Sequence, residues 1–442
     1  MLKKAVSILL ILIFYCCSKD IGIYFSPSSN TPEISFVKTF GGTVNESGRS
    51  VISTLDNGYL VAGYTQSIDG DITTTKKTVQ NDFWVLKFDA DDNLQWQKTY
   101  GGSKDDKAFQ IIQTNDAGFA VVGHGKSNDG DVQTNEGFDD VWVLKLNSDG
   151  TIAWEKTIGF SGADQGFSII QTSDTGFFVG GILDVTASGG LGNSKLTKKH
   201  AGGDYWGIKL NASGDIEWRN YFGGTNTDIC YDVTETADGY LLVGTSDSND
   251  VDVKNNQGSY DFWVVKTDKS GQMLWEKSYG GTEIDEARAI AKTNDGNFII
   301  VGETRSSDKD VSKNNGGADV WAIKINTEGK LLWQKNYGGA SFDVGRSISK
   351  TLDGNFLISG SSRSSDNNLE NKGQNDAFII KISSNGNLLW QKTVGGTEID
   401  FCYDAVALAN GTIIAVGESS SSNQDITTNK GFSDLLIIKL KP

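Results

Sequence analysis

Pairs of closely spaced aspartates recur in this chain, each in a polar loop that follows an apolar run. The complete copies have the pattern Ser-x-Asp-x-Asp and contribute Asp69, Asp71, Asp129, Asp131, Asp250, Asp252, Asp308 and Asp310. Carboxylates at this spacing could bind Ca²⁺, which takes roughly six to eight oxygen ligands in proteins. The EF-hand spacing with its distal Glu is absent, and Asp-Gly is also a common turn former. The pattern therefore predicts either a calcium site or a turn, and turn formation is the simpler interpretation.

A second set of residues able to contact a ligand follows a glycine motif that occurs seven times. Each lies eight positions after the first glycine, and all are arginines or aromatics: Arg49, Phe109, Phe167, Tyr231, Arg288, Arg346 and Tyr403. Guanidinium groups and aromatic rings could hold carboxylates or stack on sugars. The same side chains could instead fill a channel between the elements that carry them. Both interpretations stay open.

The third copy of the repeated unit contains an insertion. It runs 23 residues from Gly181 to Asp204, whereas the matching stretch of the fourth copy runs 17, from Gly244 to Asp261. The insertion is basic in an acidic chain, with Lys195, Lys198, Lys199 and His200. Because function often lies on long loops held by a rigid scaffold, this loop is a candidate for contact with a partner.

Signatures of catalysis are lacking in the sequence. The chain has only two histidines, His124 and His200, far apart in sequence. We find no nucleophile motif, zinc-ligand cluster, dinucleotide fingerprint or phosphate loop. A non-catalytic binding or scaffold protein is therefore favoured, with no cofactor except possible calcium. A carboxylate-dependent hydrolase or lyase of polysaccharides is the alternative, since acidic residues are plentiful.

The glycine motif itself is an internal repeat. Its copies begin at residues 41, 101, 159, 223, 280, 338 and 395, so successive copies lie 60, 58, 64, 57, 58 and 57 residues apart. A fixed period of this kind indicates a repeat architecture. In the fifth copy, strand-like runs at 286–293, 298–304, 319–325 and 331–337 are separated by Asn-, Asp- and Gly-rich turns. Four antiparallel strands per copy predict an all-β, seven-bladed β-propeller.

The two ends of the repeat region complement each other. The seventh copy stops after its third strand, at Leu440-Lys441-Pro442, and the stretch 34–40 aligns with a fourth strand, Phe36 taking the place of Trp96. We therefore predict that the N-terminal strand completes the last blade and closes the ring, which removes exposed sheet edges between the first and last blades. The domain prediction is 34–442 for the propeller.

Several columns of identical residues run through the copies. All eleven tryptophans fall on the third or fourth strand, which suits packing between blades. Three polar columns are an acid at the start of the first strand, an Asp before the third strand and a Lys five residues later. We expect structural roles for them, as turn caps and ion pairs. In a four-stranded meander the loops after the second and fourth strands share one face of the ring. That face, with its longer and acidic loops, is the expected binding face.

The N-terminus predicts export. Lys3 and Lys4 precede an apolar run, Ala5 to Tyr15, that is too short to span a bilayer, which needs roughly 20 residues. We assign 1–16 to a signal peptide and 17–33 to a flexible tether.

Two cysteines remain in the repeats, Cys230 and Cys402. They belong to the fourth and seventh copies and occupy a column of small residues. They are predicted to be buried and unpaired, because those copies are not neighbours in the ring.

The chain is acidic, with a net charge of −16 and a pI near 4.6. Nucleic-acid binding depends on Lys and Arg that neutralise phosphates, so this charge argues against nucleic acid as a partner. It fits an exported protein, or one that favours cations or basic partners.

The repeat resembles bacterial β-propeller repeats of the SBBP type. The resemblance rests on runs such as Thr99-Tyr100-Gly101-Gly102 and Asp116-Ala117-Gly118-Phe119, and covers about residues 34–442. The third and fourth strands also resemble quinoprotein-like propeller repeats.

The stretch Cys17-Ser18-Lys19-Asp20 resembles the processing site of Bacteroidetes lipoproteins. That resemblance implies lipidation of Cys17 and anchoring at the outer membrane; the alternative is an ordinary secreted protein. These resemblances imply a cell-envelope lipoprotein, facing the periplasm or the surface, that binds a polysaccharide or an envelope protein. It would be a monomer, or an accessory subunit of an outer-membrane assembly or transport complex.

Overall fold

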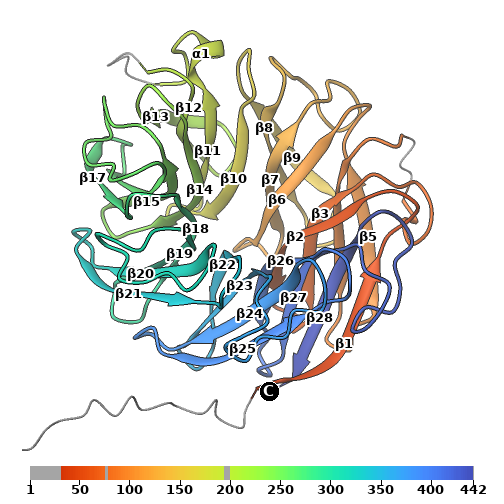
Figure 1. Ribbon diagram of the computed structural model, residues 1–442. Coiled ribbons are helices and arrows are strands. Elements are labelled where there is room, and N and C mark those ends of the chain that lie inside the picture. The colour runs from red at the N-terminus through yellow and green to blue at the C-terminus, as the bar shows by residue number, and fades with distance from the viewer. Residues whose placement is uncertain (1–30, 75–77, 194–199, 442) are drawn as a thin grey trace, which may run out of the picture.

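Seven four-stranded antiparallel sheets surround a central axis in the computed structural model (Figure 1). The structure describes residues 31–74, 78–193 and 200–441. The predicted signal peptide 1–16, most of the predicted tether, Cys17 and Lys195, Lys198 and Lys199 lie outside these residues. Within them the prediction of an all-β, seven-bladed propeller is confirmed.

The first four blades follow the chain in order. Blade 1 contains β2 (Glu46–Ser53), β3 (Tyr59–Thr65), β4 (Asp82–Phe88) and β5 (Leu94–Tyr100). Blade 2 contains β6 (Asp106–Gln113), β7 (Phe119–Gly125), β8 (Asp140–Leu146) and β9 (Ile152–Ile158). Blade 3 contains β10 (Gln165–Gln171), β11 (Phe177–Asp184), β12 (Gly203–Leu210) and β13 (Ile216–Phe222). Blade 4 contains β14 (Asp228–Glu235), β15 (Gly239–Ser246), β16 (Asp261–Asp268) and β17 (Met273–Tyr279).

The last three blades complete the ring. Blade 5 contains β18 (Asp285–Lys292), β19 (Phe298–Thr304), β20 (Asp319–Ile325) and β21 (Leu331–Tyr337). Blade 6 contains β22 (Asp343–Lys350), β23 (Phe356–Ser362), β24 (Asp376–Ile382) and β25 (Leu388–Val394). Blade 7 contains β26 (Asp400–Ala407), β27 (Ile413–Ser419), β28 (Asp434–Lys441) and β1 (Glu33–Phe40). The first strand of each blade lines the axis, where these strands contact one another around the ring (Figure 1).

The N-terminal strand closes the ring as predicted. β1 pairs antiparallel with β28 from Glu33 opposite Lys441 to Phe40 opposite Leu435, one residue longer than the predicted strand. Phe40 also reaches into blade 1, where its ring lies 5.5 Å from that of Phe88. The closing strand therefore joins the core shared by the last and first blades.

One helical turn departs from the all-β prediction. α1 (Val185–Ser188) lies in the insertion of the third repeat, where no helical periodicity is visible in the sequence. The Asp184 side chain caps it by accepting a hydrogen bond from the Ala187 N–H, and Gly189 ends it in the left-handed conformation. Such caps stabilise a single turn that has little intrinsic helix preference. No helix of the described residues is long and apolar enough to cross a membrane.

The core lies between neighbouring blades. The third-strand tryptophans are fully buried there, and each indole packs on an aromatic residue or aliphatic side chains of the adjoining sheet. For example, the ring of Trp142 lies 4.5 Å from that of Phe83 in blade 1, and Trp263 lies 4.6 Å from Tyr205 in blade 3. The predicted packing role of this column is confirmed.

The fourth-strand tryptophans cover a glycine turn of the next blade. Gly329 adopts φ +72°, and a Cβ there would lie 2.9 Å from the Trp275 ring. Tyr279 of the same strand donates a hydrogen bond to the Gly329 carbonyl. Glycine is needed at this turn for both its backbone conformation and the close approach of the indole.

The lysine column forms ion pairs. In blades 1 to 6 each Lys Nζ lies 2.6 to 3.0 Å from an Asp in the tight turn of its own blade, as in Lys87 with Asp56 and Lys324 with Asp295. In blade 7 Lys439 pairs instead with Asp92 of blade 1. The predicted structural role of this column is confirmed.

Cys230 and Cys402 are buried free thiols, also as predicted.

Candidate functional site

The glycine–acid loops and the Asp-rich loops lie on one face, here called the long-loop face. Thr43 N donates to Asp69 Oδ1 at 2.9 Å, and Gly41 N donates to Asp71 Oδ2 at 3.0 Å. The same pair of contacts recurs in blade 2, where Asp129 and Asp131 accept from the loop at Ser103 and Gly101. The prediction that the two kinds of loop meet on one face is confirmed.

These contacts give the aspartate pairs a structural role. Asp250 and Asp308 accept backbone N–H bonds at 2.9 Å in the same way. Asp310 Oδ2 accepts from Gly280 N at 3.3 Å. Asp252 lies 3.7 Å from His200 Nε2. Within residues 31–74, 78–193 and 200–441, no group of three or more acidic, His or Cys side chains is placed to hold a metal ion. Calcium binding by these aspartates therefore stays a prediction.

The acid at the start of each first strand holds the glycine loop. All seven carboxylates accept the backbone N–H four residues earlier at 2.7 to 2.9 Å. In five blades a loop serine also donates its hydroxyl to the same carboxylate. The second Asp column caps turns likewise, as when Asp319 Oδ2 accepts from Asn315 N at 2.9 Å.

These two columns bring buried carboxylates together at the blade junctions. A Cβ on Gly280 would lie 2.3 Å from Asp261 Oδ1 and 2.6 Å from Asp285 Oδ2, so only glycine fits between them. Burial, with a smaller contribution from Asp285, raises the pKa of Asp261 to about 7. Burial also raises the pKa of Asp140 and of Asp319 to about 6. The junction carboxyl groups hence take up protons at a higher pH than exposed aspartates do.

A β-bulge positions the seven residues here called the axial ring: Arg49, Phe109, Phe167, Tyr231, Arg288, Arg346 and Tyr403. In every first strand the pairing register shifts by one residue around this position. A bulge leaves one residue unpaired and re-aims its side chain. The opposing glycine of the second strand makes room for it, because a Cβ there would lie 1.7 to 2.0 Å from a carbonyl oxygen of the bulged strand.

Most ring residues contact one another across the axis. The Arg49 guanidinium lies 3.9 Å from the Tyr403 ring centroid, and its Nη2 donates to Tyr64 Oη at 2.8 Å. Arg288 lies 4.2 Å from the Tyr231 ring and pairs with Glu286 at 2.6 Å. The Phe109 and Phe167 rings meet edge to face at 5.1 Å. The aromatic members thus stack on protein side chains and fill much of the channel.

A cavity of about 150 Å³ remains at the axis, and all seven ring residues line it. Arg49, Arg288 and Arg346 line it together with two buried carboxyl groups, Asp232 and Asp404. Asp232 accepts hydrogen bonds from Ser168 Oγ, Val233 N and Ile290 N, so it ties three blades together. Burial raises the pKa of both aspartates to about 6. The cavity is therefore lined both by arginines and by carboxyl groups that already accept several hydrogen bonds.

His200 faces inward from the inserted loop. Its Nδ1 lies 2.5 Å from Asp204 Oδ2, and its side chain is 1% exposed. Its ring also lies 4.9 Å from the Tyr221 ring. Burial lowers the pKa of His200, but the hydrogen bond and charge of Asp204 outweigh that effect and raise it. The structure thus separates His200 from any surface patch and places it at the junction of blades 3 and 4.

Sequence reasoning missed a column that links neighbouring blades. The residue four before the second-column Asp reaches the second loop aspartate of the next blade. Lys430 Nζ lies 2.5 Å from Asp71 Oδ2, and Gln257 Nε2 donates to Asp310 Oδ2 at 2.6 Å. This column could have been found from its fixed position four residues before the second-column Asp. It was missed because the residue type at that position varies between blades.

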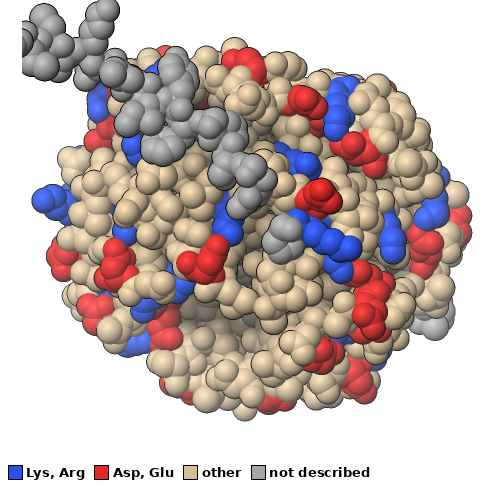
Figure 2. Space-filling model, turned by 90° about the horizontal axis from the view of Figure 1, so that it is seen from below, with Lys and Arg blue, Asp and Glu red and all other residues tan. Residues whose placement is uncertain are grey.

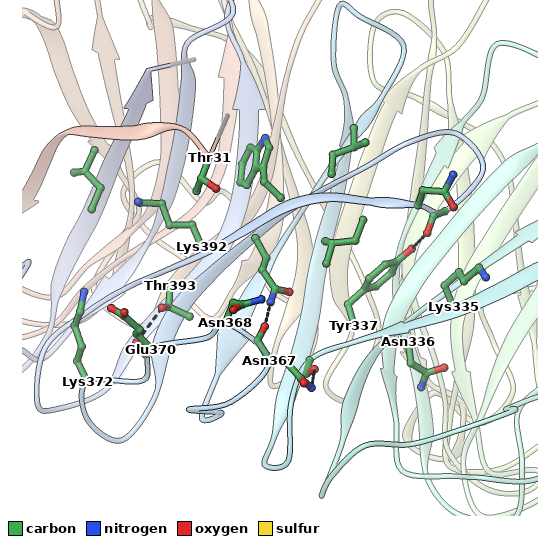
Figure 3. Close-up of a pocket in the computed structure, with 18 residues that line it drawn as sticks. Thr31, Lys335, Asn336, Tyr337, Asn367, Asn368, Glu370, Lys372, Lys392 and Thr393 are labelled. Carbon is green, nitrogen blue, oxygen red and sulfur yellow. Dashed lines mark hydrogen bonds between the residues drawn. The ribbon is translucent and has the colours of Figure 1, made fainter. Parts of the chain in front are cut away.

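A second groove lies on the rim rather than at the axis. It has a volume of about 1030 Å³ and runs along β25 from Tyr337 of blade 5 to Thr31 and Ile34 at the start of β1 (Figure 3). Blade 7 has chain ends where the other blades have a turn between the third and fourth strands, so no glycine turn covers this part of blade 6. On this side of the molecule acidic and basic side chains are interspersed (Figure 2). The groove is thus a product of ring closure.

Comparison with known proteins supports the fold. No protein-family model matches the chain. Over 252 residues the chain is 23% identical to the regulatory protein FlaEY of Caulobacter vibrioides, covering 52% of this chain and 26% of that protein. The chain thus spans about a quarter of the length of this relative.

Solved structures with this architecture include the WD40 β-propeller domain of Doa1. It superposes with a TM-score of 0.53 at 11% identity and covers 93% of this chain and 97% of its own. A protein of unknown function from Bacteroides caccae superposes with a TM-score of 0.40 at 12% identity, covering 70% and 90%. At these identities the likeness concerns the fold alone.

Proposed function

We propose that this protein is a non-catalytic binding or scaffold propeller of the cell envelope. It is held at the outer membrane by a lipid on Cys17, and its long-loop face holds a glycan or an envelope protein. It belongs to the SBBP-type, quinoprotein-like propeller repeats.

One observation carries this proposal: a uniform frame presents a variable ring. The acid column makes the same backbone contact in all seven blades and the Lys column the same ion pair in blades 1 to 6, whereas the bulged position differs in charge and shape around the axis. Bulges at such positions commonly re-aim side chains at functional sites. The repeated columns, here called the frame, support folding in every blade. The variable axial ring is therefore the set of positions available for recognising a ligand.

The location of the acids supports a non-catalytic role. Asp261 and Asp319, whose pKa is raised, are buried at blade junctions where they hold backbone loops, and the two raised carboxyl groups at the axial cavity, Asp232 and Asp404, already accept hydrogen bonds from the inner strands. A hydrolase or lyase needs such groups within reach of substrate. We therefore favour binding over catalysis.

Three experiments test the proposal. Co-purification from solubilised outer membrane distinguishes a subunit of a stable complex from a free binder. A glycan array, probed with and without Ca²⁺, tests polysaccharide binding and the calcium prediction together. If the protein retains neither a glycan nor an envelope protein, the binding role is contradicted. Unchanged membrane association of Cys17→Ser would contradict the lipid anchor.

A further inference from the structure

Three guanidinium groups line the axial cavity, and their partners differ. Arg49 has the Tyr64 hydroxyl and the face of Tyr403, and Arg288 has Glu286 and the face of Tyr231. Among the residues that the structure describes, Arg346 has no hydrogen bond, no ion pair within 4.0 Å and no aromatic ring beneath it. Its guanidinium is not among the buried unpaired polar groups, and Arg346 lines the cavity. Arg346 thus brings unbonded N–H donors to the cavity, with Glu303 as the opposite charge that affects it most.

The surroundings of Arg346 make this arrangement costly. Its pKa is lowered by burial and by the positive charge of Arg288 on the neighbouring blade. Glu303 is the acid that most favours the charged form of Arg346, although no ion pair within 4.0 Å joins the two; burial raises the pKa of Glu303, and Arg346 lowers it more than Arg288 or Arg305 does. Two guanidinium groups that face one cavity repel each other, and an anion bound beside them would relieve this repulsion.

We propose that the axial cavity is a binding site for one carboxylate group, held by Arg346 with Arg288 beside it. Planar guanidinium groups match carboxylates with paired N–H donors. The assignment deepens the proposed binding function, on which it rests, by naming the chemical group that the axis recognises.

The size of the cavity restricts what enters. At about 30 Å³ per water molecule, a volume of about 150 Å³ holds about five waters. That is room for a carboxylate and the short carbon stem that bears it. Phe109, Phe167 and Tyr231 pack against one another edge to face or at a tilt, and guanidinium groups cover the Tyr231 and Tyr403 rings, so a cavity of this size does not hold a sugar ring as well. The ligand's carboxylate therefore enters while the rest of the ligand stays outside.

The aspartates that line the cavity do not compete for Arg346. Asp404 accepts hydrogen bonds from Val51 N at 2.9 Å, Ser50 Oγ at 3.2 Å and Ala405 N at 2.9 Å. Asp232 is saturated in the same manner. Their oxygens are committed to backbone donors of the inner strands, which leaves the guanidinium of Arg346 to an external anion.

Acetate is the probe, because it is a carboxylate with one carbon attached. Thermal unfolding of the full chain is followed in sodium acetate and in sodium chloride at equal ionic strength. The variants are Arg346→Met and, as a matched control, Lys350→Met, which removes an exposed charge at the far end of the same strand β22. Circular dichroism checks that each variant is folded.

We expect acetate to raise the unfolding midpoint of the wild type and of Lys350→Met in a saturable way, and to leave Arg346→Met unchanged. Without acetate, Arg346→Met should unfold at the wild-type temperature or above it, since the substitution removes a positive charge that has no hydrogen bond and is repelled by Arg288. A purely space-filling role for Arg346 predicts the opposite, a lower midpoint and an unaltered acetate response.

Three results would overturn the assignment: no acetate effect on the wild type, an acetate effect that survives in Arg346→Met, or a rise with inorganic phosphate but none with acetate. The wider function is tested separately. Should acetate bind as expected while no glycan or envelope protein is retained, the subsite stands and the proposed binding function fails. Retention of a partner without any acetate effect would instead overturn the subsite and leave the binding function standing.

Discussion

Ring closure by β1 makes a quantitative prediction at Phe40. This side chain is half-buried in the core between blades 7 and 1 and meets Phe88 edge to face at 5.5 Å, with Phe88 stacked on Tyr59 at 4.8 Å. Removing a fully buried Phe costs about 3–5 kcal/mol. For a half-buried ring that keeps one aromatic contact we take about half, so Phe40→Ala should lower the free energy of unfolding by about 2 kcal/mol.

The assay is equilibrium unfolding in urea, followed by tryptophan fluorescence and circular dichroism. The matched control is Lys38→Ala on the same strand, where the side chain is exposed and a change within about 0.5 kcal/mol is expected. The closure is refuted if Phe40→Ala shifts the unfolding curve no more than Lys38→Ala does. Two separate transitions in the wild type would likewise contradict a core that β1 shares with both blades.

Three further predictions follow from the buried groups. Because burial raises the pKa of Asp140 and Asp319 to about 6 and that of Asp261 to about 7, the folded chain binds protons that the unfolded chain releases; the unfolding temperature should therefore rise as the pH is lowered from 8 to about 5. Below about pH 4 the unfolding temperature should fall again, since hydrogen bonds from Lys87 and Thr54 outweigh the effect of burial and lower the pKa of Asp56 to about 2. An unfolding temperature that stays constant from pH 8 to 5 would contradict the raised pKa of the junction carboxyl groups. Burial raises the pKa of the Cys402 thiol to about 12 and that of Cys230 further, so neither should react with a thiol reagent until the chain unfolds, and rapid labelling of either in the native protein would count against the packing. Gly329→Ala should destabilise the chain by about 1–2 kcal/mol in urea unfolding, through its positive φ and its approach to Trp275, whereas an unchanged midpoint would show that the indole does not cover this turn.

The frame could be predicted from the sequence because its determinants are local and repeated. The number of glycine motifs and their regular spacing indicate the blade count. The match of Phe36 to Trp96 identifies the closing strand. The bulge under the axial ring also left a signal, since a glycine stands in every second strand, as at Gly302 and Gly360. A glycine inside a strand often marks a bulge or a close backbone approach.

The chemistry of the axis could not be predicted in the same way. Arg49, Arg288 and Arg346 are equivalent in the alignment of the repeats, yet only two of them find partners. Those partners come from the same and adjacent blades, and whether a contact forms depends on side-chain packing across the channel. His200 is similar: its charge suggested an exposed basic loop, and only the fold places it 2.5 Å from Asp204.

The most direct test of the account compares the ring with the frame in one capture experiment. The full chain and its Arg346→Met and Lys350→Met variants are isolated from solubilised outer membrane and analysed for bound protein and glycan. A recognition role for the ring predicts that the wild type and Lys350→Met retain the same ligand, and that a folded Arg346→Met loses it. Equal retention by all three would contradict the claim that the variable axial ring, presented by a uniform frame, carries the function.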